Sequence, residues 1–194
     1  MSAGKADSEP ERITPTLPAS AIRVPMTRQS TCYTCGVAAV QSVFAFYGLE
    51  FREDELSRLL GAGPRHGTRY RRIEKLAREH GFEVDIRTGL TLKELEKLLD
   101  SGKPVICLLQ AWPEEKKDYE SDWDDGHYVV AVGHDRENIF FMDPSTLGNY
   151  TYVPRAEFEK RWHDTDGKEK VVHFGMILSK GKPSYDPGAV KKME

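Results

Sequence analysis

The sequence predicts an α+β domain with N-terminal helices packed against a mostly antiparallel sheet, and three observations lead to this prediction. Helical spacing of apolar residues dominates the front half of the chain, and strand-like patterns dominate the back half. No repeat of fixed period interrupts this order. Hydrophobic residues make up 39% of the 194 residues, which suffices for one sizeable core.

Four helices are expected in the front half, each followed by a glycine that favours a helix end. Thr34 is a candidate N-cap for the first helix, whose apolar residues recur every three to four positions. Thr91 and Glu94 form a capping-box pair at the start of the fourth helix. The expected helices span residues 35–47, 53–60, 68–80 and 91–101.

Six strands and a short fifth helix complete the expected domain. The run Pro104–Leu109 is apolar throughout, as in a strand at the centre of a sheet. The polar segment 134–138 separates two apolar runs and predicts a hairpin turn. The expected strands span 83–88, 104–109, 127–132, 139–142, 150–153 and 171–178, and the short helix lies near 156–162.

The composition places this domain between two tails and excludes several classes of protein. Residues 1–20 are interpreted as a flexible arm, 21–180 as the domain and 181–194 as a tail. The net charge of −3 and the pI of about 6.1 argue against a general binder of nucleic acid. The sequence has neither a membrane-spanning apolar run nor a secretory signal, and its three cysteines cannot build a disulfide framework. A cytoplasmic location is therefore expected.

Cys35 is the first candidate for chemistry because it stands at the first position of the predicted first helix. Unpaired backbone N–H groups and the helix dipole favour a negative charge there, and the thiolate is the nucleophilic form of cysteine. Gly36, Ala38 and Ala39 leave room for a substrate or another backbone near the sulfur. The alternative is a buried structural cysteine in a helix of small residues.

Cys32 precedes Cys35 with the spacing of a redox Cys-X-X-Cys motif. In thioredoxin-like proteins this motif follows the first strand of an alternating strand–helix fold, and the order of elements here is different. A structural zinc site would need a second pair of ligands, and Cys107, the third cysteine, lies in a predicted core strand. Cys32 is therefore interpreted as a loop residue.

His127 and Asp143 are the second pair of candidates, since His127 opens an apolar strand and Asp143 closes the next one. A hairpin loop with an odd number of residues, centred on residue 135, would place the two directly opposite each other, with Cβ atoms about 5 Å apart. An even number would send them to opposite faces of the sheet. Neighbouring His and Asp side chains fit an oriented general base, and the alternative is an edge histidine beside a turn aspartate.

Gln29 stands six residues before Cys35. Its side-chain N–H could stabilise a developing oxyanion together with the backbone N–H at the helix start. A solvated loop glutamine is the alternative.

The stretch 113–125 holds seven acidic residues and directly precedes His127. It is interpreted as a solvated loop, and a rim or lid that selects basic substrate residues is the alternative. Trp112 and Trp123, which lie beside and within this stretch, are interpreted as core or groove-wall residues.

The segment from Gln29 to Gly48 resembles the nucleophile segment of the bacteriocin-processing cysteine peptidases, the papain-like domains that remove double-glycine leader peptides. The shared pattern is a Gln, five residues, Cys-Gly, a small-residue helix and a closing Tyr-Gly. Residues 126–133 (Gly-His-Tyr-Val-Val-Ala-Val-Gly) resemble the family's histidine strand, and residues 139–144 (Ile-Phe-Phe-Met-Asp-Pro) its aspartate strand. The resemblance covers roughly residues 24–178, with one departure: Thr34 stands where the family usually has an aspartate.

The resemblance implies a papain-like fold and cysteine peptidase activity. Cys35 would be the nucleophile, His127 the base, Asp143 the residue that orients it, and Gln29 the oxyanion donor. A peptide or protein substrate with small residues before the scissile bond is implied, with no metal or organic cofactor. The chain carries no exporter membrane region or ATPase, so a stand-alone member of the family is expected.

Two other functions remain open at the level of the sequence. Papain-like folds also host acyl and peptidyl transferases, which keep the acyl-enzyme and change the acceptor from water to an amine. A non-catalytic module could use the same groove to bind peptides without turnover.

Overall fold

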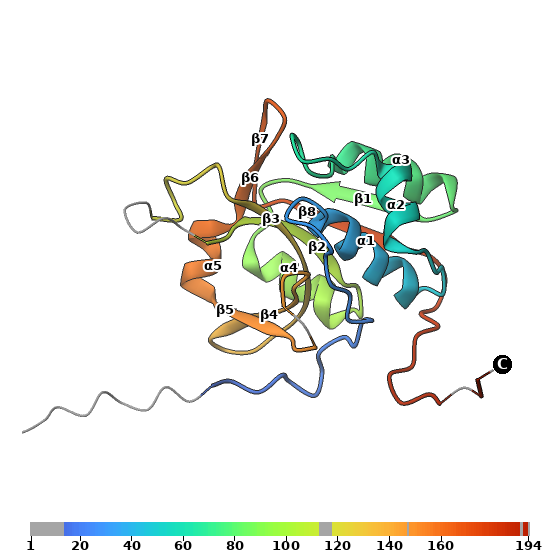
Figure 1. Cartoon of the computed structure of the whole chain (residues 1–194). Helices are drawn as coiled ribbons and strands as arrows, with labels where there is room; N and C mark the ends of the chain where they lie inside the picture. The colour runs from blue at the N-terminus through green and yellow to red at the C-terminus, as the bar shows by residue number, and fades with distance from the viewer. Residues whose placement is uncertain (1–13, 113–117, 147, 191, 194) are drawn as a thin grey trace, which may run out of the picture.

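An antiparallel sheet in the order β1-β8-β2-β3-β4-β5 forms the framework of the described part of the chain (Figure 1). The computed structural model describes residues 14–112, 118–146, 148–190 and 192–193. The strands of this sheet are β1 (Glu83–Arg87), β2 (Val105–Gln110), β3 (Gly126–His134), β4 (Asn138–Met142), β5 (Thr151–Pro154) and β8 (Gly175–Ser179). Strands β6 (His163–Asp166) and β7 (Glu169–Val172) pair in a separate small sheet. The predicted α+β class with a mostly antiparallel sheet is confirmed.

The helices lie around this sheet, and each buries apolar residues in the interior of the domain. They are α1 (Cys35–Phe46), α2 (Glu53–Leu60), α3 (Tyr70–Glu79), α4 (Leu92–Asp100) and α5 (Arg155–Arg161). Figure 1 shows α1, α2 and α3 as one group, in which α1 contacts β3 and α3 contacts β1. Helix α4 contacts β2 and β3, and α5 contacts β2, β4 and β5.

The helix boundaries agree with the sequence prediction to within two residues, and one predicted cap is wrong. The capping box of α4 is confirmed, because Glu94 N donates to Thr91 Oγ1 at 3.3 Å and Thr91 N donates to the Glu94 carboxylate at 2.9 Å. The Thr34 side chain does not cap α1. Its hydroxyl donates to the carbonyl of Thr31 at 3.3 Å instead, within the turn that leads into the helix.

The single strand predicted over residues 171–178 is wrong, because two strands, β7 and β8, replace it. His173 separates them with a left-handed backbone (φ 50°), and its N–H donates to the Trp162 carbonyl at 2.7 Å. The buried Trp162 indole donates in turn to the carbonyl of Phe174 at 2.8 Å. Strand β6 was not predicted, since the sequence His-Asp-Thr-Asp has no apolar alternation.

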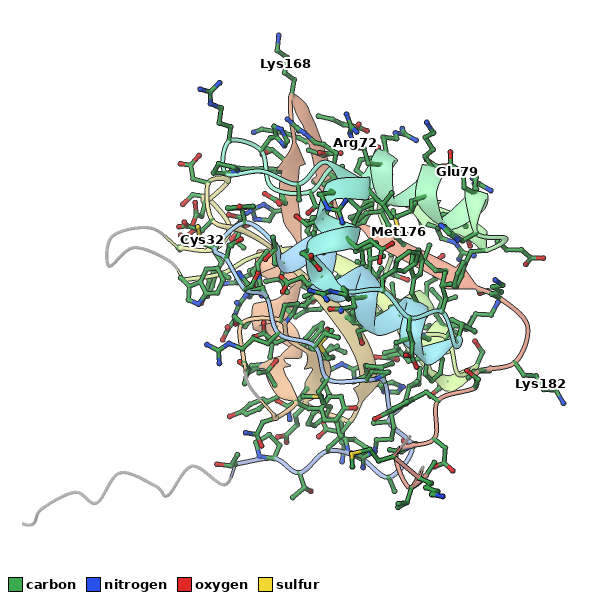
Figure 2. All side chains as sticks on the ribbon, turned by 45° about the vertical axis from the view of Figure 1, so that its right-hand side comes forward. Cys32, Arg72, Glu79, Lys168, Met176 and Lys182 are labelled. Carbon is green, nitrogen blue, oxygen red and sulfur yellow. The ribbon has the colours of Figure 1, made fainter. Side chains whose placement is uncertain are left out.

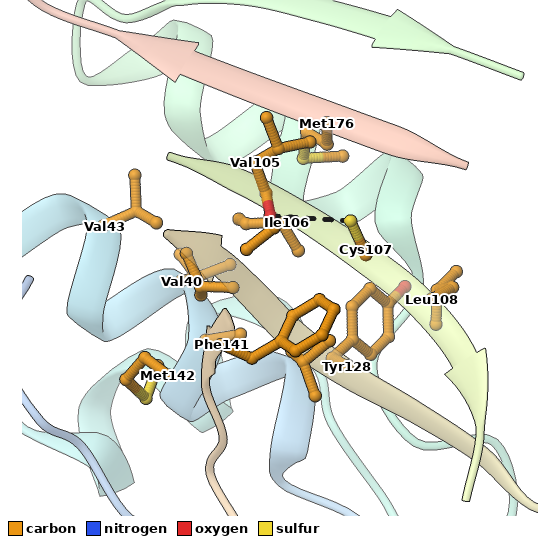
Figure 3. Packing of buried hydrophobic residues seen from close by; sticks show 14 of the residues in the cluster. Val40, Val43, Val105, Ile106, Cys107, Leu108, Tyr128, Phe141, Met142 and Met176 are labelled. Atoms are coloured by element: carbon orange, nitrogen blue, oxygen red, sulfur yellow. Dashed lines mark hydrogen bonds between the residues drawn. The ribbon is translucent and has the colours of Figure 1, made fainter. Parts of the chain in front are cut away.

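The centre of the core lies where β2 and β3 meet α1 (Figure 3). All six residues of β2 are buried, so both faces of the sheet are covered there, as the continuous apolar run predicted. Figure 3 shows Val40 and Val43 of α1 close to Ile106 and Phe141 of the sheet. Such a packed core gives α1 a fixed position relative to β3, which matters for the residue at the start of the helix.

The tails extend beyond this core on both sides. Of the predicted arm, residues 1–13 lie outside the described residues, and 14–20 contain no helix or strand. In the predicted tail, the backbone N–H groups of Ser184 and Tyr185 donate to the carbonyl of Phe46 at 3.0 and 3.2 Å. The proposed division of the chain at residues 20 and 180 stays a prediction.

The β3–β4 hairpin contains a bulge that changes its register. Near the turn, His134 pairs with Ile139 and leaves an even loop of four residues. On the other side of the bulge, which lies between Ala131 and Gly133, Val130 pairs with Met142. The extra residue, Val132, shifts the pairing by one position.

The N-terminal segment is attached at this bulge. The backbone N–H of Ile22 donates to the carbonyl of Val132 at 2.8 Å. A Cβ atom at Gly133 would lie 2.8 Å from the Cβ of Ala21, so the close approach of the two backbones requires a glycine there. The segment therefore gives a hydrogen-bond partner to a residue that the bulge removes from the ladder.

Replacing Gly133 by alanine is expected to lower the free energy of unfolding by about 1–3 kcal/mol, because the added methyl group overpacks against Ala21. Urea denaturation followed by circular dichroism measures this change. The second substitution Ala21→Gly in the same chain should recover part of the loss, since it removes the opposing methyl group. Equal stability of Gly133→Ala and the wild type would contradict this account of the bulge.

Candidate active site

Cys35 is the first residue of α1 and is only 8% exposed. The helix is held close to the sheet at this point, because a Cβ at Gly36 would lie 2.8 Å from the Thr68 Cβ and 3.0 Å from the Tyr128 ring. The small residue after the cysteine therefore allows close packing of the helix. As a consequence, the thiol lies at the sheet end where β3 begins.

His127 and Asp143 form a direct hydrogen bond, in which His127 Nε2–H donates to Asp143 Oδ1 at 2.8 Å. Neither of the two arrangements considered from the sequence is found, because the loop is even but the register after the bulge continues to Asp143 opposite Val129. His127 lies two residues from Val129 and thus on the same face of the sheet. The two side chains meet diagonally across the strands.

The Asp143 carboxylate is held by its own loop. Oδ1 accepts hydrogen bonds from Ser145 N at 2.9 Å and from Ser145 Oγ at 2.8 Å, and Oδ2 accepts one from Thr146 Oγ1 at 3.3 Å. These donors fix the orientation of the carboxylate and, through it, the orientation of the His127 ring. Because Nε2 is engaged by Asp143, Nδ1 is the ring nitrogen left for Cys35.

The electrostatics of His127 favour its protonated form. Burial of the ring alone would lower its pKa, but the hydrogen bond with Asp143 and the contact with Cys35 outweigh burial and raise the pKa to about 9. Burial would likewise raise the pKa of Asp143, but the hydrogen bonds from His127 and Ser145 hold it below its ordinary value. Around neutral pH the pair is therefore an imidazolium and a carboxylate.

Gln29 lies on the loop before α1, and its contacts differ from those expected. Its side-chain Nε2 donates to the carbonyl of Thr31 at 2.8 Å, and its backbone N–H donates to the carbonyl of Pro144 at 3.0 Å. The second contact joins the loop before Cys35 to the loop that carries Asp143. The Oε1 atom of Gln29 is buried without a hydrogen-bond partner among the described residues.

Trp112, interpreted from the sequence as a core or groove-wall residue, lies beside His127. Its ring centroid lies 4.8 Å from that of His127, although the residue is 58% exposed. Its backbone is left-handed (φ 49°), which is an outlier for a bulky side chain. Such strain is found where the surrounding structure requires a particular side-chain position, and here that position covers the His127 ring. No periodicity in the sequence signals such a position.

A cavity of about 350 Å³ opens beside Cys35. The cysteine, Thr68, Gly126 and Tyr128 line one part of it, and the β6–β7 hairpin with Asp164 lines another. No pattern in the sequence indicates that Asp164 lines the same cavity as Cys35, because β6 was not predicted.

Asp164 is a buried carboxyl at the wall of this cavity. It is 7% exposed, and Gln110 Nε2 donates to its Oδ1 at 3.1 Å. A Cβ at Gly126 would overlap the carboxyl group, so Asp164 occupies the space that a side chain there would take. Burial raises the pKa of Asp164 to about 7, against the opposing hydrogen bonds from Thr165 and Gln110.

The acidic stretch 113–125 is only partly the solvated loop that was expected. Residues 113–117 lie outside the described residues. Asp122 is fully buried, and Asp124 lines the cavity beside Cys35. The interpretation as a solvated loop is therefore wrong for Asp122.

Metal binding and membrane insertion can both be assessed from the described part of the chain. It contains no group of three His, Cys, Asp or Glu side chains placed to hold a metal ion. None of its helices combines the length and the apolar character needed to cross a membrane.

Comparison with known proteins places this arrangement in a family. The model of the family described as "Peptidase_C39 like family" matches residues 21–170. The chain is 30% identical over 137 residues to the transport/processing ATP-binding protein ComA of Streptococcus pneumoniae, a match that covers 66% of this chain and 16% of ComA. It is 26% identical over 154 residues to the LcnC-like lactococcin transport/processing ATP-binding protein of Lactococcus lactis, covering 79% and 18%. The chain thus spans less than a fifth of the length of these relatives.

Solved structures share the fold at lower sequence identity. A putative C39-like peptidase from Bacillus anthracis has a TM-score of 0.63 at 19% identity, with 84% of this chain and 97% of that chain covered. A double glycine motif protease from an AMS/PCAT transporter, solved in complex with the leader peptide, has a TM-score of 0.58 at 22% identity, with 86% and 96% covered. The peptidase domain of Streptococcus ComA also reaches 0.58, at 20% identity and with 81% and 98% covered. These likenesses bear out the expected papain-like peptidase fold.

Asp143→Asn is expected to lower the pKa of His127 from about 9 by at least about one unit, because the carboxylate that raises it is lost while burial remains. In the wild type the imidazolium stabilises the fold fully below the ordinary histidine pKa of about 6.5, and this contribution disappears as the pH rises through about 9. NMR titration of the histidine ring protons between pH 5 and 10 measures the midpoint, and His127→Gln assigns the signal. An unchanged midpoint in Asp143→Asn would show that the carboxylate does not control the proton on His127.

Proposed function

The chain belongs to the Peptidase_C39 like family, and from this premise we propose that it is a cysteine peptidase that hydrolyses peptide bonds with Cys35 as nucleophile. The observation that carries the proposal is the hydrogen bond between His127 and Asp143 on a ring that also interacts with Cys35. The alternative of a structural histidine beside a turn aspartate does not account for the contact of this ring with a thiol at a helix N-terminus. In this proposal Cys35 is the nucleophile, His127 is the base, and Asp143 is the carboxylate that orients the base.

The first chemical step is attack on the substrate carbonyl. His127 as an imidazolium stabilises the Cys35 thiolate, and the first turn of α1 adds its backbone N–H groups. The thiolate attacks the carbonyl carbon, and the carbonyl electrons move to its oxygen. The Cys35 backbone N–H and the second amide hydrogen of Gln29 are proposed to bind this oxyanion.

The second step breaks the peptide bond, and the third restores the thiol. His127 gives its Nδ1 proton to the leaving nitrogen as the C–N bond breaks, which leaves a thioester on Cys35. The neutral ring then takes a proton from water, whose oxygen attacks the thioester carbonyl. The C–S bond breaks, the acid is released, and the thiolate–imidazolium pair forms again.

The positions of the side chains suggest how a peptide lies in the site. The leaving group must be on the side of His127, where Trp112 covers the ring and borders an open hollow with Gln29 and Ser145. The acyl part then lies in the cavity beside Cys35, between Thr68 and the Gly126–Asp164 contact. Because Asp164 fills the space next to Gly126, we propose that residues before the scissile bond are small, with a double glycine as the test case.

Cleavage of two peptides that differ at a single position tests this proposal. One carries Gly-Gly before the scissile bond and the other Gly-Val, and kcat/KM is expected to be about 10–200-fold lower for the second, because the extra methyl groups do not fit. Mass spectrometry identifies the products, and Cys35→Ala should yield none. Cleavage that survives in Cys35→Ala would exclude the mechanism, and products joined to an added amine would favour the transferase. Peptide binding without cleavage by the wild type would favour the non-catalytic module.

Gln29→Ala is expected to lower kcat about 10²–10³-fold with little change in KM, because an oxyanion donor acts only on the transition state. The rate of Cys35 alkylation by iodoacetamide serves as the control and should stay within about twofold of the wild type, since alkylation forms no oxyanion. A loss in the alkylation rate equal to the loss in kcat would mean that Gln29 acts on the thiol instead. An unchanged kcat would remove Gln29 from the mechanism.

A further inference from the structure

The role of Cys32 is not explained by the proposed function. Cys32 is exposed and Cys35 is buried, yet both line the cavity of about 350 Å³ beside α1. Cys32 also borders the open hollow that contains Gln29 and Trp112. Figure 2 shows Cys32 at the surface of the molecule, on the loop that leads into α1. A small solute that reaches one of the two thiols therefore reaches the other.

The backbone brings the two cysteines into range of each other. Thr34 N donates to the carbonyl of Thr31 at 3.4 Å and closes a turn whose inner residues are Cys32 and Tyr33. Thr34 (φ −101°, ψ 18°) continues this coiling into α1. Residues three apart in such a coil have Cα atoms about 5–7 Å apart, and a disulfide needs about 4.4–6.8 Å. The separation expected for Cys32 and Cys35 therefore overlaps the range that a disulfide allows.

The surroundings make the two thiols chemically different. His127, held by Asp143, contacts Cys35, and a cysteine paired with an imidazolium is the one that a peroxide oxidises first. Cys32 lies outside this pair and is open to solvent. Cys107 is fully buried in β2, with its thiol directed at the Val105 carbonyl 3.7 Å away, and burial raises its pKa (Figure 3). It is therefore protected from the same chemistry.

We propose that Cys32 and Cys35 form a reversible oxidation site for hydroperoxides, in which Cys35 is oxidised first and Cys32 resolves the product as a disulfide. The inference goes beyond the proposed peptidase and needs only the reactivity of Cys35. Cys32, at the surface and three residues before Cys35, would then act as the resolving thiol.

The two steps balance with one peroxide. The Cys35 thiolate attacks the terminal oxygen of the hydroperoxide, an S–O bond forms and the O–O bond breaks. The departing alkoxide, or hydroxide in the case of hydrogen peroxide, takes up a proton to give an alcohol or water. Cys32 then attacks the Cys35 sulfenic sulfur, the S–S bond forms and the S–O bond breaks, and hydroxide leaves with the Cys32 proton as water. Two thiols lose two electrons in total, and the peroxide gains them.

The disulfide would stop the peptidase reaction and also protect the nucleophile. While it persists, Cys35 has no free sulfur to attack a substrate. A dithiol reverses it by thiol–disulfide exchange. Without a resolving thiol, the sulfenic acid goes on to the sulfinic acid, which a dithiol does not reduce.

The experiment compares the reduced full chain with Cys32→Ser after treatment with hydrogen peroxide. Both cysteines lie in the tryptic segment between Arg28 and Arg52, so peptide mass spectrometry reads their state in one peptide. In the wild type this segment is expected to lose about 2 Da, and dithiothreitol should restore about nine-tenths of the iodoacetamide-reactive Cys35. In Cys32→Ser the segment should gain about 16 or 32 Da, with less than half of the Cys35 reactivity restored. Cys107→Ala should behave as the wild type.

Two outcomes would overturn the proposal. One is a wild-type segment that gains oxygen without forming the internal disulfide. The other is recovery of Cys35 in Cys32→Ser to the wild-type level. Because alkylation and mass are measured instead of peptide cleavage, either result is independent of whether the chain hydrolyses peptides.

Discussion

The register of the β3–β4 hairpin is the constraint on which the candidate site depends. The turn leaves an even loop, and continuing that register would put Asp143 opposite Val130 and His127 on the other face of the sheet. The single extra residue at the bulge shifts the pairing, so that His127 and Asp143 share a face and meet at 2.8 Å. A local irregularity in the backbone thus determines whether the imidazole has a partner.

This constraint links distant parts of the chain. The bulge exposes the Val132 carbonyl, and the segment that leads from Ile22 toward α1 uses it. The same segment continues to Gln29, whose N–H binds the carbonyl after Asp143. The segment before Cys35 is therefore attached to the hairpin at two points, one at the bulge and one beside the Asp143 carboxylate. Both attachments limit the movement of the segment before Cys35 relative to the hairpin that carries His127 and Asp143.

The sequence predicted those features that depend on local chemistry and missed those set by tertiary contacts. The capping box at Thr91, the helix ends and the buried strand predicted over 104–109 follow from spacing and propensity. The structure confirms them, with the strand at Val105–Gln110. The position of Cys35 at the start of α1 followed in the same way. The bulge did not, because it is stabilised by Ile22 and by the approach of Ala21 to Gly133. Strand β6 and its Asp164 were missed because packing, and not apolar alternation, sets their place.

For His127, Asp143 and Gln29, residue spacing and the family resemblance predicted different features of the candidate site. From spacing alone, His127 and Asp143 could lie on the same face of the sheet or on opposite faces. The outcome depends on whether the hairpin loop has an odd or an even number of residues, and a polar turn does not show this number. The resemblance implied that they act together, and the bulge supplies the physical reason. For Gln29 the situation is reversed. The residue is where the resemblance implies it, but its amide already donates to Thr31, so its proposed role depends on the remaining N–H.

An ionised Asp164 would repel the proposed thiolate of Cys35, and the burial of Asp164 reduces this repulsion by raising the pKa of its carboxyl. Two negative groups that share one cavity repel each other, and the thiolate of the proposed mechanism shares its cavity with this carboxyl. Burial raises the pKa of Asp164 to about 7, so around neutral pH a large fraction of it is protonated and uncharged. The protonated form of Asp164 adds no negative charge beside the thiolate of the proposed mechanism. The burial that raises the pKa of Asp164 thereby lowers the repulsion that the proposed thiolate would meet, while the carboxyl keeps its size and continues to narrow the space beside Gly126.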